Sequence, residues 1–134
     1  MACPYFIPAA PDRREFWQHR ERLPLGEGFT GRCSFSSAAE CDAETLRTQC
    51  NLGYASCAHL PAERDFDAVR FQLRAAGGAT VEVRFACERA QHPVLAGTLE
   101  YNAMLQQWAE EPDFRLRRLA EAAVLAWIER HAAR

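Results

Sequence analysis

The sequence predicts an α+β fold in a single domain, residues 1–134. Apolar and polar residues alternate between 66 and 101, which is typical of β-strands with one buried face. Apolar residues recur at helical spacing from about 114 to 131. We therefore expect an antiparallel β-meander of about three strands packed by a C-terminal helix, residues 63–134. The remaining part, residues 1–62, is rich in proline, glycine and cysteine, and we expect it to be irregular.

The first thirty-five residues alternate short polar and apolar segments with chain breakers. The prolines and glycines concerned are Pro4, Pro8, Pro11, Pro24, Gly26, Gly28 and Gly31. They predict a segment that wraps around the rest of the domain without long regular elements. A short helix is expected from Asp12, because Asp12 and Glu15 have the spacing of a capping box, and it should end before Pro24.

A second short helix is predicted at about 38–50. Ser37 and Glu40 have capping-box spacing. The apolar stripe behind them consists of Ala39, Ala43, Leu46 and Cys50. Asn51 and Gly53 can end this helix, since both residue types tolerate a positive φ.

The meander is the clearest local pattern in the chain. Val69, Phe71 and Leu73 alternate with polar residues, and Gly77–Gly78 then predicts a turn. The inward face of the next strand is expected to carry Val81, Val83, Phe85 and Cys87. We expect a third strand at 98–101, after His92–Pro93.

The last helix is expected at about 114–131, with acidic residues before its start. Its apolar face comprises Leu116, Leu119, Ala120, Ala123, Val124, Trp127 and Ile128. Leu125 lies outside this face. Together with Ala122, Leu125 is a candidate second contact surface for a partner.

Charge and hydropathy exclude several classes of protein. The net charge of −2 and the pI of about 6.1 argue against non-specific nucleic-acid binding. No apolar run approaches the ~20 residues that cross a bilayer, and the N-terminus does not resemble a signal peptide. We expect a cytoplasmic protein without membrane attachment. Thiols there stay mostly reduced, which favours metal binding over a disulfide framework.

The surroundings of the six cysteines separate them into groups. Cys87 shares an inward strand face and is expected to fill the core. Cys41 and Cys50 lie nine residues apart, on opposite sides of one continuous helix, so both cannot bind the same ion. Cys50 belongs to the apolar stripe, and Cys41 is therefore left out. The candidate ligands of a metal centre are Cys3, Cys33, Cys50 and Cys57.

Four thiolates complete either a zinc site or an iron–sulfur cluster. Zinc knuckles place two to four residues between paired cysteines, whereas Cys50 and Cys57 have six between them. This favours an iron–sulfur cluster, 4Fe–4S in type, with zinc as the alternative. Cys41 or His59 could replace one ligand. Cys57 and His59 lack a visible third partner for nucleophilic catalysis, so we do not expect an enzyme.

Three stretches carry a resemblance to known proteins. They are Cys3-Pro4-Tyr5-Phe6, then Leu23-Pro24-Leu25-Gly26 followed by Gly31-Arg32-Cys33, and Cys50-Asn51-Leu52-Gly53-Tyr54-Ala55 ending in Cys57. The chain resembles a group of small, uncharacterised bacterial proteins with this motif, and the similarity extends more faintly through 67–71 and 97–101. The resemblance implies that Cys3, Cys33, Cys50 and Cys57 belong to a recurring motif. It supplies no substrate.

The sequence thus predicts a small iron–sulfur protein for electron transfer or redox sensing. Its partner would be a redox protein or a second copy of the chain. The alternative is a zinc-stabilised or metal-free protein interaction module without catalytic activity.

Overall fold

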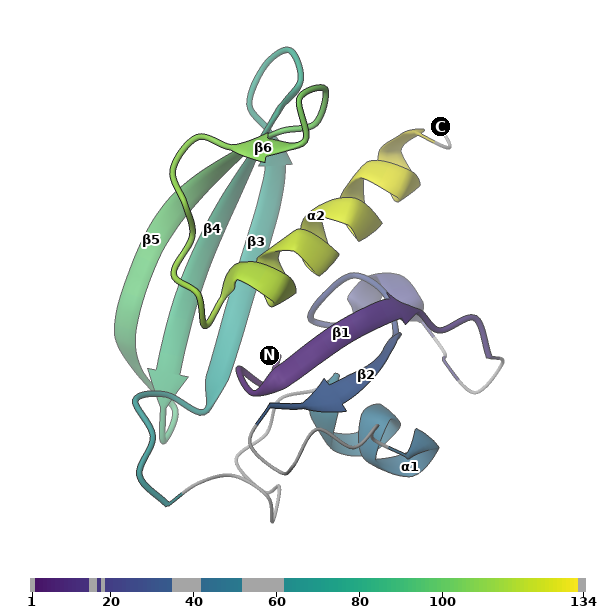
Figure 1. The fold of residues 1–134 in the computed structure, drawn as a ribbon, viewed down its shortest axis with the longest axis vertical. Coiled ribbons are helices and arrows are strands. Elements are labelled where there is room, and N and C mark those ends of the chain that lie inside the picture. The colour runs from purple at the N-terminus through teal and green to yellow at the C-terminus, as the bar shows by residue number, and fades with distance from the viewer. Residues whose placement is uncertain (1, 15–16, 18, 35–41, 52–61, 133–134) are drawn as a thin grey trace.

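The structure is a computed structural model that describes residues 2–14, 17, 19–34, 42–51 and 62–132. The described residues form two antiparallel sheets, of two and four strands, and a long C-terminal helix. The predicted α+β fold, with a meander packed by a C-terminal helix, is confirmed. Figure 1 shows the meander on one side of the helix α2 and the smaller sheet on the other.

The larger sheet is a meander in the order β3-β4-β5-β6. Its strands are β3 (Ala68–Ala75), β4 (Thr80–Arg89), β5 (His92–Asn102) and β6 (Gln107–Trp108). Gly77 and Gly78 form the β3–β4 turn with positive φ, as predicted. The strand β5 is much longer than the predicted 98–101. A two-residue turn of Ala90 and Gln91, both at positive φ, joins β4 to β5. The sequence did not predict this turn because neither position is a glycine.

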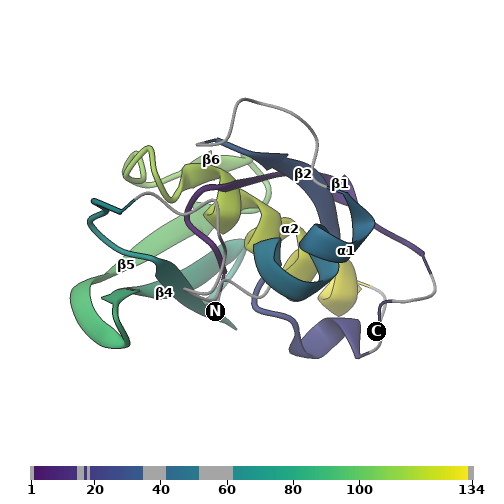
Figure 2. The same cartoon turned by 90° about the horizontal axis from the view of Figure 1, so that it is seen from below.

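The helix α2 (Arg117–Ala132) packs between the two sheets, which Figures 1 and 2 show from perpendicular directions. Asp113 caps it: its carbonyl accepts hydrogen bonds from the backbone N–H groups of Leu116 and Arg117 at 2.9 and 3.1 Å. Regular helix therefore begins three residues later than the predicted 114. The predicted apolar face is confirmed, because Leu116, Leu119, Ala120, Ala123 and Val124 are buried. None of the helices in the described ranges is long and apolar enough to span a membrane.

The N-terminal part contains a β-hairpin that the sequence analysis missed. Its strands are β1 (Phe6–Pro11) and β2 (Phe29–Cys33), paired antiparallel. The backbone N–H of Ser34 donates to Tyr5 O at 2.7 Å, so the backbone polar groups of Tyr5 face β2. Because this direction alternates along a strand, the backbone nitrogen of Pro8, three residues later, faces away from β2. Proline is tolerated on that outer side of a strand, where no ladder hydrogen bond is lost.

No helix begins at Asp12: residues 12–14 and 17, which are the described residues of that stretch, are not helical. The backbone N–H of Asp12 donates to Gly28 O at 2.8 Å, which extends the hairpin ladder by one residue. Its carboxylate accepts hydrogen bonds from the backbone N–H of Arg14 at 3.2 Å and from the Arg14 guanidinium. The guanidinium holds the pKa of Asp12 well below its usual range. A short 3₁₀ helix, η1 (Arg20–Arg22), follows instead.

The helix predicted at 38–50 is present in its C-terminal half, while its expected start lies outside the described residues. The α-helical turn α1 (Ala43–Thr45) continues into a π-helical turn, η2 (Leu46–Cys50). Asn51 then ties this turn to the hairpin: its Oδ1 accepts from the backbone N–H of Phe29, and its Nδ2 donates to Phe29 O and Leu46 O, all at 3.0–3.1 Å. One hydrophobic cluster contains Leu46 and Phe29 together with residues of β3, β4 and α2.

We expect Asn51→Ala to destabilise the protein strongly. Asn51 is buried, and the substitution leaves both backbone groups of Phe29 without these partners, at a cost of at least about 2 kcal/mol. Denaturant unfolding followed by circular dichroism measures the loss. Asn102→Ala is the matched control, since Asn102 Oδ1 accepts only from the exposed turn residues Met104 and Leu105. A cost for Asn51→Ala no larger than that of the control would contradict the anchoring role.

Candidate cysteine site

Cys3 lies at the junction between the two sheets. Ala2, before it, forms an antiparallel bridge with Val69 of β3, with hydrogen bonds of 2.7 and 2.8 Å. After it, the carbonyl of Cys3 accepts a hydrogen bond from the backbone N–H of Phe6 at 3.1 Å, which closes a tight turn with Pro4 at its second position. Both flanks of Cys3 are therefore fixed by backbone hydrogen bonds.

Cys33 lies at the end of β2, next to the same turn. Its cross-strand partner is Phe6, and the bond from Ser34 N–H to Tyr5 O makes Phe6 and Cys33 a non-hydrogen-bonded pair with neighbouring side chains. The ends of a β-turn lie within 7 Å, and such strand partners lie about 4.5 Å apart, so the Cα atoms of Cys3 and Cys33 are within about 12 Å of each other. Both residues are half-buried.

Cys50 lies at the end of the π-helical turn and is buried in the hydrophobic cluster that also contains Ala2 and Phe6. Cys3 packs against the same cluster. The turn η2 contacts β2, and Asn51 holds it there. All three cysteines among the described candidates thus belong to the N-terminal hairpin and its immediate support.

The fourth candidate ligand, Cys57, lies outside the described residues, as do Cys41 and His59. Among the residues that the structure does describe, no group of three or more histidine, cysteine or carboxylate side chains is arranged to hold a metal ion. The described chain therefore brings Cys3 and Cys33 to one end of the hairpin but does not by itself complete a ligand set.

Cys87 is a free thiol in the core, as predicted. It pairs with Val69, which in turn bridges Ala2, so that three fully buried side chains form one row across neighbouring strands. Burial raises the pKa of the Cys87 thiol to about 11. A buried thiol that ionises so poorly is suited to packing and not to metal binding or nucleophilic chemistry.

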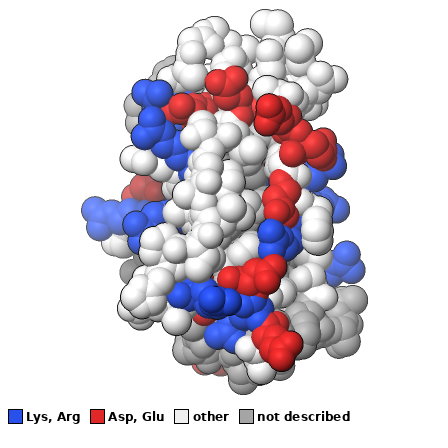
Figure 3. All heavy atoms as spheres, turned by 90° about the vertical axis from the view of Figure 1, so that its left-hand side faces the viewer, with Lys and Arg blue, Asp and Glu red and all other residues white. Residues whose placement is uncertain are grey.

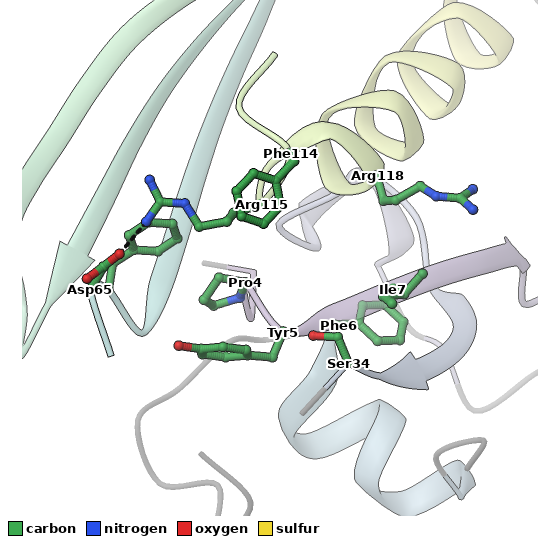
Figure 4. Close-up of a pocket in the computed structure, with 10 residues that line it drawn as sticks. Pro4, Tyr5, Phe6, Ile7, Ser34, Asp65, Phe114, Arg115 and Arg118 are labelled. Carbon is green, nitrogen blue, oxygen red and sulfur yellow. Dashed lines mark hydrogen bonds and ion pairs between the residues drawn. The ribbon is translucent and has the colours of Figure 1, made fainter. Parts of the chain in front are cut away.

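A pocket of about 400 Å³ adjoins the cysteine end of the hairpin (Figure 4). One wall is formed by the residues that directly follow Cys3, and Ser34 follows Cys33. The opposite wall comes from the start of α2 and the segment before β3. The lining residues are Pro4, Tyr5, Phe6, Ile7, Ser34, Asp65, Phe66, Phe114, Arg115 and Arg118.

Arg115 is the most firmly held charged group of this pocket. Its backbone N–H and its guanidinium both donate to Asp113, at 2.8–3.0 Å, and the guanidinium also donates to Asp65 at 2.5 Å. The guanidinium lies over the ring of Phe66, 4.9 Å from its centroid. It is therefore a fixed positive charge on the pocket wall.

The phenol group of Tyr5 lies within electrostatic range of Cys3 and of charged residues of the pocket wall. Burial is the main reason that the pKa of Tyr5 is raised, and the charges of Asp65 and Cys3 act in the same direction, whereas Arg64 and Arg115 oppose them. The Cys3 thiol and these arginines thus lie within electrostatic range of one phenol group.

No sequence pattern indicated a functional role for four of these lining residues, Asp65, Phe114, Arg115 and Arg118. The signal that could have found Arg115 is the Asp113–Arg115 pair beside the start of the predicted helix, where an aspartate cap also positions the next arginine. No periodic pattern reveals Asp65, because its contact with Arg115 spans fifty residues of sequence.

A scan against protein-family models found no match, and neither did searches of curated proteins and of solved structures. The resemblance to small bacterial proteins therefore stays a prediction. Functional arguments for this chain depend on its own residues.

We expect Cys87 to be the least reactive of the four described cysteines in the native protein. Its thiol is fully buried and its pKa is raised to about 11, so little thiolate is present or accessible. Alkylation with iodoacetamide at mildly alkaline pH, followed by peptide mass spectrometry, should leave Cys87 unmodified until denaturant is added.

The same pKa shift predicts a loss of stability in alkali. The unfolded thiol ionises from pH about 9, whereas the folded thiol stays neutral until about 11, so the unfolded state is favoured as pH rises through this window. Cys87→Ala removes the titrating group and should flatten this part of the stability profile. Rapid alkylation of Cys87 in the native protein would contradict its expected low reactivity and would show that the sheet opens at this position.

Proposed function

We propose that this chain is a small iron–sulfur protein that transfers electrons or senses redox state in the cytoplasm. The proposed ligands of its 4Fe–4S cluster are Cys3, Cys33, Cys50 and Cys57. When bound, such a cluster supplies one-electron redox chemistry, and the protein holds and shields it. This role requires a protein redox partner.

The observation that supports the proposal most is the proximity of the backbones of Cys3 and Cys33 at one end of the hairpin. They are thirty residues apart in the sequence, yet one turn and one strand pair separate their backbones. Backbone hydrogen bonds fix both positions without any help from a metal. Backbone positions that are fixed in advance lower the entropy cost of bringing ligands to a common ion.

The surroundings of this pair suit a buried anionic centre. Phe6 is buried beside Cys33, and the ring of Tyr5 follows Cys3, so apolar side chains limit the access of water. Arg115 and Arg64 supply positive charge near Tyr5, two residues after Cys3. Solvent exclusion and nearby charge are the two properties by which a protein sets the potential of a cluster.

The second candidate function is a zinc-stabilised or metal-free interaction module. The observation that favours it is the exposure of large apolar side chains: Phe114 is 86% exposed and Leu125 58%. Ala122 is buried, so it does not join Leu125 in an exposed contact surface as the sequence suggested. Metal analysis separates the two functions, since zinc gives a colourless protein.

Protein purified without oxygen should be brown and should contain iron and acid-labile sulfide. Cys33→Ala should remove the colour and the iron, because it takes away a proposed ligand. The fold should be kept, since Cys33 is half-buried at a strand end and little packing is lost. Cys87→Ala is the matched control: it changes a cysteine of the same chain in the core and should retain the full iron content.

Two results would contradict the proposal. One is a colourless, iron-free protein after anaerobic reconstitution with iron and sulfide, with zinc content then distinguishing the alternative module from a metal-free one. The other is unchanged iron content in Cys33→Ala. Circular dichroism of each variant ensures that a loss of metal is not a loss of fold.

A further inference from the structure

The pocket beside the cysteine end of the hairpin has the size and the construction of a small-molecule site. Its volume of about 400 Å³ lies in the range of pockets that bind small ligands. Three parts of the chain form it, namely the hairpin, the segment before β3 and the start of α2. The bridge from Ala2 to Val69 fixes the first of these parts, and the Asp113 cap fixes the third. The pocket is therefore formed before any ligand binds.

Aromatic side chains supply the apolar part of this pocket. Phe6 and Phe66 are buried members of the core cluster, so their rings are held in place. Tyr5 and Phe114 lie on opposite walls (Figure 4). The ring of Phe114 is 86% exposed. A planar aromatic group between these two walls would contact both rings and remove apolar surface of Phe114 from water.

The two arginines that line the pocket differ in their partners. Arg115 is neutralised, because its guanidinium donates to both Asp113 and Asp65. Figure 3 shows similar neighbours over one face of the molecule, where basic side chains lie beside acidic ones. Arg118 is exposed, one helical turn after Phe114, and no carboxylate of the described chain forms an ion pair with it. The pocket thus offers one positive charge that a ligand can neutralise.

The position of the charges gives a bound anion one orientation. In Figure 4, the pair of Asp65 and Arg115 lies at one side of the pocket and Arg118 at the other. Ser34 lies on the wall opposite α2, and its hydroxyl makes no hydrogen bond within the described residues. Because the Asp65 carboxylate repels negative charge on its own side, an anionic group would lie between Arg118 and Ser34.

We propose that this pocket binds a small aromatic carboxylate. The ring of the ligand lies between Tyr5 and Phe114, and its carboxylate accepts hydrogen bonds from the Arg118 guanidinium and the Ser34 hydroxyl. A guanidinium matches the planar geometry of a carboxylate with two parallel hydrogen bonds. A phosphate monoester fits less well, since it carries up to about two negative charges and the excess would be repelled by Asp65.

Isothermal titration calorimetry with 2-naphthoate tests the site. This probe should bind with a Kd on the order of 10⁻⁴ M. Its uncharged analogue, 2-naphthalenemethanol, should bind about three- to tenfold more weakly, because it loses the ion pair with Arg118. The saturated analogue, decalin-2-carboxylate, should bind about two- to tenfold more weakly, because it loses the ring contacts.

Arg118→Gln should weaken the binding of 2-naphthoate about three- to tenfold and leave that of 2-naphthalenemethanol unchanged. The difference between the two ligands then disappears, which a general loss of structure would not produce. Arg117→Gln is the matched control. Arg117 is an exposed arginine of the same helical turn, but it pairs with Glu111 and Glu121 and does not line the pocket. This variant should bind like the wild type.

Phe114→Ala should weaken both ligands about equally, by roughly two- to tenfold, since it removes one aromatic wall and no charge. Its control is Leu125→Ala, which shortens an exposed apolar side chain of the same helix outside the pocket. Both positions are exposed, so the fold should be kept, and circular dichroism verifies this for each variant.

The proposal would be overturned if 2-naphthoate did not bind at millimolar concentration, or if 2-naphthalenemethanol bound as tightly. A folded Arg118→Gln that still distinguished the two ligands, or a folded Phe114→Ala with unchanged affinity, would also overturn it. Binding of these ligands requires no metal, so the iron content of the protein and its affinity for 2-naphthoate test the two proposals separately.

Discussion

The antiparallel bridge between Ala2 and Val69 is the contact on which the arrangement of the N-terminal part depends. Its two hydrogen bonds, at 2.7 and 2.8 Å, attach the start of the chain to the first strand of the meander. Because Ala2 and Val69 are fully buried, water cannot replace these bonds. Cys3 is one residue further along. Its position, and the direction in which β1 leaves toward α2, both follow from this attachment.

The bridge also explains why the candidate site and the pocket lie side by side. The turn after Cys3 brings Tyr5 and Phe6 to the pocket wall, and the capped start of α2 brings Arg115 to the opposite wall. Cys3 and the pocket wall are therefore joined by a short segment whose backbone is held by hydrogen bonds.

The sequence predicted the meander well because a period of two with one buried face is a local signal, confirmed at Val69, Val81, Val83 and Cys87. It did not predict β1 and β2. Pro8 has no N–H, and only the register with β2 shows that none is needed there. The proximity of Cys3 and Cys33 depends on that same register, so spacing alone could select these residues but could not place them.

Two of the strands with an unpaired outer side, β1 and β5, are protected unequally. Prolines protect β1, whereas the central segment of β5 has neither charge nor proline. In Figure 1, β5 and the hairpin lie on opposite sides of α2. The cysteine candidates of the hairpin and the uncharged segment of β5 therefore lie on opposite sides of the helix that packs between the two sheets.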